Sequence, residues 1–414
     1  MALSPAAPPT LERLLDTAAA LFWEKGYAAT TTREIAAAVG VQQASLYYHV
    51  ASKEDLLHQI CVSSLEQLLI DVESAVNEAG NPLDRIRILI RAHLRTLLKY
   101  QKRNVTMITE LRALSPRHRA EVVALRQRYA KLVRSVLADA QAAGMVRADI
   151  RAKYLCLALL NVLNRAVLWF RREKALSPDQ LADLFIPIYL NGAAASSARV
   201  SLTLPDLKRR RRKPASRPRG SRGASQNSTL ERLLDAAAAL FSRKGYAATS
   251  TREIAALLGI QKASLYYHIE SKEDLLYAIC KSSLEQIRSD VETALDNVRD
   301  PLERTRTLVS AHVESLLRDQ AKHSTALAEM HALSEERLAQ VMSLRDGYED
   351  LVRSVLRDAQ RAAALRDDID VKYLCLCLLG MINRVEAWFR PSGTLSPDQL
   401  GQLLAVIFLT GAAA

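Results

Sequence analysis

Cysteine is scarce in this chain and does not occur in metal-binding patterns. The 414 residues include five cysteines, spread thinly and without a Cys-x-x-Cys pair. An odd number with this spacing excludes a disulfide framework and the common zinc motifs, and it is typical of a reducing compartment. We therefore expect a cytoplasmic protein without disulfides.

Long hydrophobic runs are also missing. The longest, around residues 154–163, is too short to cross a bilayer, and the first ten residues lack the basic and apolar regions of an export signal. A strand-like alternation of apolar and polar residues is not sustained in any part of the sequence either. We expect no membrane partner, and an all-α fold is the prediction.

The sequence contains one domain arrangement twice. Residues 11–22 return as 230–241, and the same offset of 219 continues without a gap through both copies. Over 11–58 the copies agree at 37 of 48 positions, whereas over 99–146 they agree at only 21 of 48. The period is too long for a solenoid, so it indicates a duplicated domain whose first part kept its chemistry.

Helical spacing dominates both copies. Apolar residues return every three or four positions, and capping boxes that begin at Thr31, Ser177 and Ser250 mark helix starts. Together with the proline and glycine positions, these signals predict about nine helices per copy.

Positive charge is in excess, but one segment holds most of it. The formal charge is +12, and residues 193–228 contribute +9, from ten Lys or Arg against Asp206. Within them, 208–222 (KRRRRKPASRPRGSR) has almost nothing to bury, which predicts a basic disordered linker. A linker of 36 residues could span at most roughly 120 Å, and a relaxed coil of that length averages about 35 Å.

A short segment near the start of each copy carries the functional signal. A short amphipathic helix that follows Thr31 and ends at Gly40 is joined by a tight turn to a second short helix within 41–49. Two such helices form a helix-turn-helix, whose second helix can enter the major groove of DNA. Glutamines there can pair with base edges, while hydroxyls, a histidine and a lysine can hold phosphates.

The candidate DNA-binding residues occupy matching positions in the two copies. They are Thr31, Thr32, Gln42, Gln43, Ser45, Tyr47, Tyr48, His49 and Lys53, and then Ser250, Thr251, Gln261, Lys262, Ser264, Tyr266, Tyr267, His268 and Lys272. The informative difference is Gln43 against Lys262, since glutamine suits adenine and lysine suits guanine or a phosphate. In the alternative interpretation, both side chains face the DNA backbone or solvent.

The succession TTREIAAAVGVQQASLYYHVASKEDLL, repeated as STREIAALLGIQKASLYYHIESKEDLL, resembles the DNA-binding signature of TetR-family transcriptional repressors. The resemblance implies an N-terminal three-helix head that binds an operator half-site, and C-terminal helices that bind a small effector and pair two subunits. It also implies that the effector releases the operator. The domains expected on this basis are heads at 1–52 and 229–271, effector-binding and pairing domains at 53–192 and 272–414, and the linker at 193–228.

The last third of each copy suggests how an effector could be held. Arg165 and Trp169, like Arg384 and Trp388, are four residues apart and are predicted to share one face of an apolar helix. A buried arginine needs a partner, so an anionic ligand is one candidate, and a salt bridge at the pairing surface is the alternative.

The WFR and LSPDQL sequences at this end resemble the subgroup that responds to acyl-coenzyme A thioesters. Gly380 stands at the position of Asn161, so the two cores are not identical. The candidate effector-binding residues are Tyr154, Asn161, Asn164, Arg165, Trp169, Tyr373, Asn383, Arg384 and Trp388.

Other reactive side chains are predicted to be structural. His93, Glu110 and His118 lack close metal-ligand spacing, and ordinary helix-surface positions are favoured over a metal site. Cys61 and Cys280 match between the copies, and buried thiols are favoured over a redox switch. We find no nucleophile elbow, phosphate loop or repeated carboxylate pair, so we expect no enzyme activity, no cofactor and no metal.

The sequence therefore predicts a ligand-responsive DNA-binding repressor, associated with the nucleoid, that acts as an intramolecular pseudo-dimer on a pseudo-palindromic double-stranded operator. A small-molecule effector, such as an acyl-CoA or a related hydrophobic anion, would release it. The alternative is an architectural DNA-binding protein that senses no effector.

Overall fold

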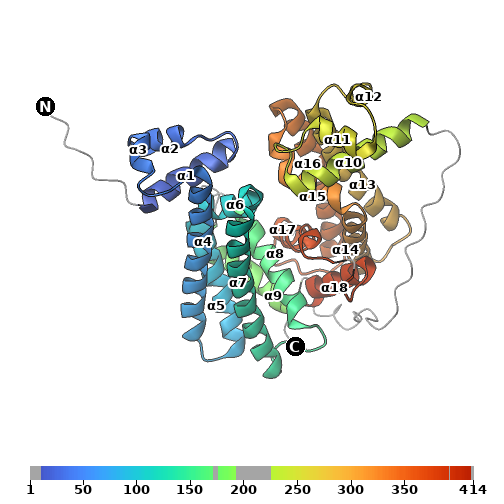
Figure 1. Ribbon diagram of the computed structural model, residues 1–414. Coiled ribbons are helices and arrows are strands. Elements are labelled where there is room, and N and C mark those ends of the chain that lie inside the picture. The colour runs from blue at the N-terminus through green and yellow to red at the C-terminus, as the bar shows by residue number, and fades with distance from the viewer. Residues whose placement is uncertain (1–10, 171–175, 193–224, 391, 412–414) are drawn as a thin grey trace. The chain divides into compact units, whose positions relative to one another are not determined.

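The computed structural model describes residues 11–170, 176–192, 225–390 and 392–411, and all regular secondary structure in these ranges is helical (Figure 1). The basic segment 208–222 lies outside the described residues. The range predicted as a linker overlaps the described chain only where helix α10 begins, at Ser225. The predicted all-α fold is confirmed.

The described residues form two compact units, and the division falls inside helix α9, between Ile186 and Pro187. The helices up to that point are α1 (Leu11–Lys25), α2 (Thr32–Val39), α3 (Gln43–Leu46), α4 (Lys53–Asn77), α5 (Pro82–Lys99), α6 (Gln101–Thr109), the 3-10 helix η1 (Leu111–Ala113), α7 (Pro116–Ala142), α8 (Ala152–Trp169) and α9 (Pro178–Asn191).

The same order returns in the second copy. Its helices are α10 (Ser225–Lys244), α11 (Thr251–Leu258), α12 (Lys262–Tyr266), α13 (Lys272–Leu295), α14 (Pro301–Arg318), α15 (Gln320–Glu329), η3 (Met330–Ala332), α16 (Glu335–Arg361), α17 (Val371–Ile382), η4 (Val385–Ala387) and α18 (Pro397–Thr410). The expected nine α-helices per copy are present among the described residues.

The helix starts follow local hydrogen-bond chemistry. Thr31 and Ser250 form the predicted capping boxes with glutamates three residues later. Ser177 and Gln180 exchange the same pair of bonds, at 2.7 and 3.1 Å. These side chains satisfy amide groups that the first helical turn leaves without partners.

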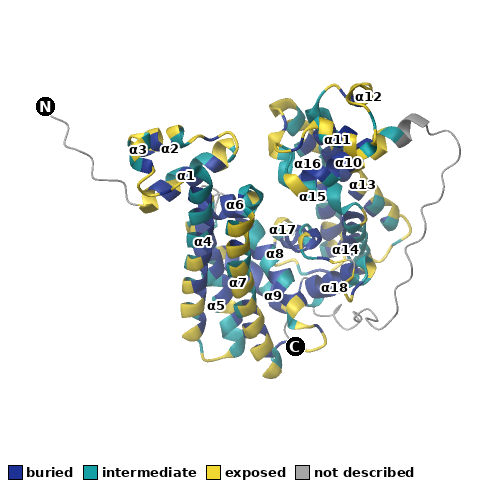
Figure 2. Cartoon of the chain, viewed as in Figure 1, coloured by how far each residue is buried: buried dark blue, intermediate teal, exposed yellow. Residues whose placement is uncertain are grey.

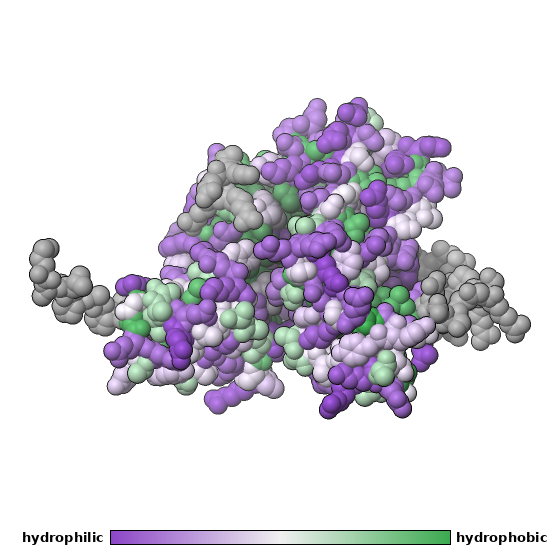
Figure 3. All heavy atoms as spheres, turned by 90° about the horizontal axis from the view of Figure 1, so that it is seen from above, coloured by the Kyte–Doolittle hydropathy of each residue, from purple (hydrophilic) through white to green (hydrophobic). Residues whose placement is uncertain are grey.

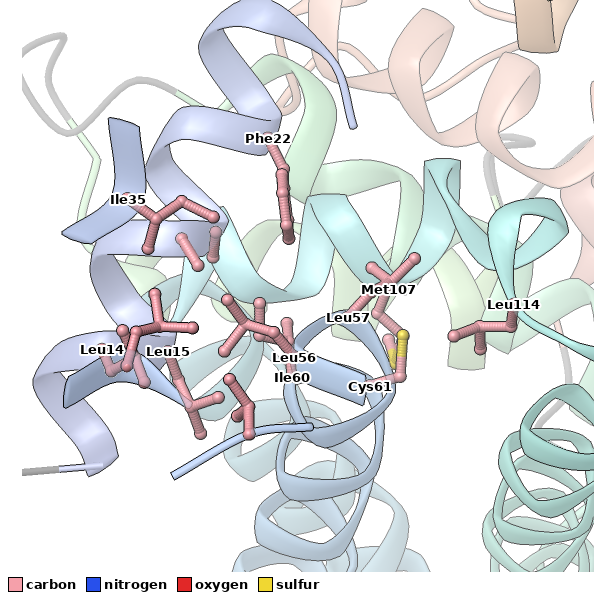
Figure 4. Close-up of a cluster of buried hydrophobic side chains, with 14 of the residues drawn as sticks. Leu14, Leu15, Phe22, Ile35, Leu56, Leu57, Ile60, Cys61, Met107 and Leu114 are labelled. Carbon is pink, nitrogen blue, oxygen red and sulfur yellow. The ribbon is translucent and has the colours of Figure 1, made fainter. Parts of the chain in front are cut away.

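In the first copy, the core of the head is continuous with the helices that follow it. Leu14 and Leu15 of α1 pack with Leu56 and Ile60 of α4, and the same cluster reaches Met107 of α6 (Figure 4). Burying each such side chain contributes about 1.5–3 kcal/mol, so the head cannot shift without disturbing α4. The second copy has an equivalent cluster built on α10 and α13.

Burial follows the predicted amphipathic pattern within each unit, with buried residues on the inward faces of the helices (Figure 2). Hydrophilic residues cover most of the face visible in Figure 3. Within the described ranges, no helix is long and apolar enough to cross a membrane.

Candidate DNA-binding surfaces and effector-binding cores

The two short helices of each head are joined by a turn that requires glycine. Gly40 ends α2 at a φ of 80°, and Gly259 ends α11 at a φ of 68°. Both lie in the left-handed region, where a side chain would add strain. The chain can therefore turn sharply into α3 or α12, which gives the predicted helix-turn-helix.

The head residues divide into a buried set and an exposed set. Ile35, Val39 and Leu46 are buried beneath the turn. Tyr48 and its counterpart Tyr267 are 90% and 79% exposed, which is unusual for a tyrosine and leaves most of each side chain accessible to a partner.

The other predicted DNA-binding residues are exposed or partly buried. The exposed ones are Thr31, Gln42, Tyr47, His49, Ser250, Gln261, Lys262, Ser264 and Tyr266, and the partly buried ones are Thr32, Gln43, Ser45, Lys53, Thr251, His268 and Lys272. The predicted DNA contacts stay predictions, but the side chains of the helix-turn-helix itself are gathered on its solvent side.

The position that differs between the recognition helices also differs in its contacts. Gln43 Nε2 donates to Thr32 Oγ1 at 3.0 Å, and that oxygen lies 3.3 Å from the Tyr47 hydroxyl. In the second copy, Lys262 Nζ lies 5.5 Å from the centre of the Tyr266 ring. The first head thus presents an internally bonded amide where the second presents a cation.

Lys53 and Lys272 are tied to their own heads. Lys53 Nζ donates to the carbonyls of Tyr27 and Thr30, both at 2.8 Å, and lies 4.3 Å from the centre of the Tyr27 ring. Lys272 makes the corresponding contacts to Tyr246. Partial burial lowers the pKa of both lysines. Each lysine therefore fixes the loop between the first two helices to the start of the long fourth helix, a role that the sequence did not suggest.

The proposed effector residues are arranged differently in the two copies. Arg165 and Trp169 both lie in α8, where Trp169 packs edge to face against Phe185 at 6.2 Å. The prediction of the same arrangement in the second copy is wrong, because α17 ends at Ile382 and Arg384 and Trp388 follow it.

Two local differences account for the shorter helix. Gly380 replaces Asn161 and lowers helix stability by several tenths of a kcal/mol, on the order of 0.5. Glu386 replaces the buried Val167 and lies 3.6 Å from Arg384 as an ion pair. A carboxylate in this core needs a positively charged partner, and the irregular backbone after α17 allows Arg384 to be that partner.

The expectation that both arginines are buried cations is also wrong. The Arg384 side chain is 41% exposed, and Arg165 is only partly buried. Of the remaining candidates, Tyr154 is buried, whereas Asn161, Asn164, Tyr373 and Asn383 are partly buried.

A buried histidine and tyrosine pair, which the sequence did not single out, lies at the same place in both copies. His93 Nδ1 is 2.7 Å from the Tyr129 hydroxyl, and His312 Nδ1 is 2.7 Å from the Tyr348 hydroxyl. Within the described part of the chain, Nε2 of each histidine is buried and makes no hydrogen bond.

Burial lowers the pKa of both histidines to about 3, and the nearby Asn164 and Asn383 offset part of this effect. Each copy thus holds a buried, neutral imidazole beside a predicted effector residue, Asn164 in the first copy and Asn383 in the second. The sequence signal was a histidine and a tyrosine 36 residues apart in both copies.

The residues that the sequence offered as metal ligands or redox groups do not form one site. His93 and Glu110 do not join His118, whose ring instead stacks on His58 with centroids 3.9 Å apart. The expectation of a helix-surface position is wrong for His93, which is fully buried. Cys61 and Cys280 are fully buried, and burial raises the pKa of each thiol to about 12. The expectation of buried thiols is confirmed.

Several of the similar proteins are transcriptional regulators about as long as one copy. The HTH-type transcriptional repressor KstR2 of Mycobacterium tuberculosis H37Rv is 29% identical over 186 residues, which are 45% of this chain and 93% of KstR2. The fatty acid metabolism regulator protein of Bacillus subtilis is 20% identical, over 38% of this chain and 81% of its own length. The crystal structure of the TetR-family regulator PfmR from Thermus thermophilus shows 34% identity over 44% of this chain and 98% of PfmR, with a TM-score of 0.41.

Two family sequence profiles match both copies, and they follow in the same order in each copy. The profile described as "Bacterial regulatory proteins, tetR family" matches residues 14–60 and 233–279. The profile described as "Tetracyclin repressor-like, C-terminal domain" matches residues 79–193 and 298–412. The chain therefore belongs to the TetR family of regulators, with both family domains present twice.

Proposed function

We propose that this chain is a ligand-responsive transcriptional repressor that acts as a covalent pseudo-dimer on a single pseudo-palindromic operator. The observation that carries the proposal is the presence of two complete helix-turn-helix heads in one polypeptide. KstR2, named a repressor, corresponds in length to only one copy. One chain here thus contains what two such chains would contribute to a twofold site.

The exposed side of each head supplies the DNA contacts in this proposal. Tyr48 and Tyr267 offer hydroxyls to phosphates, while Gln42 and Gln261, both exposed at the start of the recognition helices, reach base edges. A cytoplasmic, nucleoid-associated location goes with this role.

We place the effector beside His93 in the first copy and His312 in the second. If the Tyr129 hydroxyl donates to His93 Nδ1, the ring proton is on Nε2, which then donates to a carbonyl oxygen of the ligand. The surrounding helix faces are apolar, and Arg165, nearer the surface, suits an anionic group. An acyl-CoA thioester has a carbonyl oxygen, an apolar acyl chain and anionic phosphates. The name of the Bacillus relative, a fatty acid metabolism regulator, points to the same chemistry.

Selection of bound DNA from a random pool, followed by release assays with acyl-CoA compounds, tests the proposal. A repressor should saturate one short pseudo-palindrome and resist competitor DNA, and an acyl-CoA should release it. His93→Phe combined with His312→Phe should keep operator binding and lose release. Coating of any duplex without saturation would instead favour an architectural DNA-binding protein.

A further inference from the structure

A second cluster of histidines and carboxylates lies away from the effector core, where α4 begins and α7 begins. Asp55, His58 and His118 each place one metal-binding atom so that the three atoms lie within 4.8 Å of one another. Asp55 and His58 are one helical turn apart on α4, and His118 comes from the first turn of α7. The His58 and His118 rings are nearly parallel, at 10°.

Each imidazole is held by a carboxylate through one nitrogen. Glu54 accepts from His118 Nδ1 at 2.9 Å, and Glu121 accepts from His58 Nε2 at 3.0 Å. Such a bond fixes the protonated nitrogen and leaves the other one with a lone pair, which is the usual arrangement around histidines that bind metals. The Ala51 amide and the Gln59 side chain both donate to Asp55 Oδ2, and among the described residues none donates to Oδ1.

The cluster also has an excess of negative charge. In the described chain, no lysine or arginine forms an ion pair with Glu54, Asp55 or Glu121. With neutral imidazoles, three carboxylates therefore share a small region without a compensating cation, which favours binding one.

The second copy shows how the same place is neutralised by protein side chains. Arg337 replaces His118 and forms ion pairs with Asp274 and Glu273, while Tyr277 replaces His58 and donates to Gln340. The arginine supplies permanently the positive charge that the first copy lacks.

We propose that Asp55, His58 and His118 form a binding site for one divalent transition metal ion, present in the first copy only. Two imidazoles and one carboxylate suit Zn²⁺, Co²⁺ or Ni²⁺ better than Mg²⁺ or Ca²⁺, which prefer oxygen ligands. The side chains of His58 and His118 are 13% and 24% exposed, so water can complete the coordination.

The site joins the head to the body of the first unit. The beginning of α4 belongs to the head core through Leu56 and Leu57, and Glu54 also accepts from the Ser115 amide at the start of α7. A bound ion would fix this junction in one copy while the other keeps its permanent ion pairs. Any resulting change in operator affinity rests on the proposed function, whereas metal binding itself does not.

Titration of the full metal-free chain with Co²⁺, followed by visible absorption and calorimetry, tests the site. We expect one Co²⁺ per chain, with absorption bands of a nitrogen-and-oxygen site and competition by Zn²⁺. Glu54→Gln, which alters a hydrogen-bond partner of a ligand and not a ligand itself, should weaken binding about tenfold.

The second copy supplies the matched control. The triple variant His58→Tyr, His118→Arg, Glu121→Gln gives the first copy the side chains that the second copy already accommodates, so it should fold and lose the Co²⁺ bands. His118→Gln alone serves as an independent variant. Retention of one Co²⁺ by the folded triple variant, or absence of saturable binding by the unaltered chain, would overturn the proposal. If these metal results hold while operator affinity is insensitive to Zn²⁺, the site stands and its coupling to the head does not.

Discussion

Lys53 illustrates how a residue that looks like a DNA contact can serve the fold. Its Nζ donates to two carbonyls of the loop before α2, and Lys25, an exposed lysine nearby, forms an exposed ion pair with Glu34. We predict that Lys53→Met destabilises the head by about 2 kcal/mol, because charged hydrogen bonds to partly buried carbonyls are lost.

Denaturant unfolding measures this loss, and Lys25→Met, which removes only an exposed ion pair, is the control. The salt dependence of operator binding then separates the two roles of Lys53. A positioning lysine leaves the slope of log affinity against log salt unchanged, whereas a phosphate contact reduces it by about 1.

The buried histidines predict a pH dependence of stability. His93 and His312 titrate near 6.5 in the unfolded chain but near 3 when folded, so the unfolded state binds more protons below pH 6.5. The contribution of these histidines to the free energy of unfolding should therefore be fully present above pH 6.5. It should fall by about 1.4 kcal/mol per pH unit per histidine as the pH drops toward 3.

Urea unfolding between pH 7 and pH 5 checks the slope. His93→Gln with His312→Gln should reduce the slope even if both variants are less stable at pH 7, and His323, whose pKa burial lowers to about 4, accounts for part of the slope that remains. His49→Gln, at an exposed site, should leave the slope unchanged. An unaltered slope in the double variant would show that other groups set the acid sensitivity.

At the scale of helices, the recognition helices α3 and α12 differ mainly at Gln43 and Lys262. We predict that Lys262→Gln makes the selected operators more symmetric, with an effect of about 1–3 kcal/mol at the affected base pair if the contact is bidentate. Sequencing of DNA selected by each variant measures the change. Gln43→Lys should also make the operator more symmetric, with both half-sites resembling the one that Lys262 selects. Unchanged base preferences in both variants would mean that neither side chain reads a base.

The sequence predicted elements well where local chemistry decides them. Capping at Thr31 and the left-handed Gly40 are set within a few residues, so the helix-turn-helix could be predicted. The end of α17 could not, because it depends on a buried Glu386 and its arginine. The His58 and His118 pair was missed for a similar reason, since 60 residues separate rings that only folding brings into contact.

At the scale of the whole molecule, duplication allows the two halves to diverge while both family domains stay in one chain. Both heads have exposed tyrosines, whereas the first copy has histidines at a junction where the second has an arginine. A symmetric dimer of identical chains could not hold such differences, because both subunits would carry the same side chains.

The pseudo-dimer predicts that both heads must be intact in the same chain. We expect Tyr47→Ala with Tyr48→Ala to abolish tight operator binding by disabling the first head, and Tyr266→Ala with Tyr267→Ala to do the same through the second. An equimolar mixture of the two variants should also fail, because no chain then carries two working heads. Sedimentation of the unaltered complex should give one chain per minimal operator. Recovery of tight binding by the mixture, with two chains per operator, would show instead that heads from separate chains combine and that the covalent link is not what pairs them.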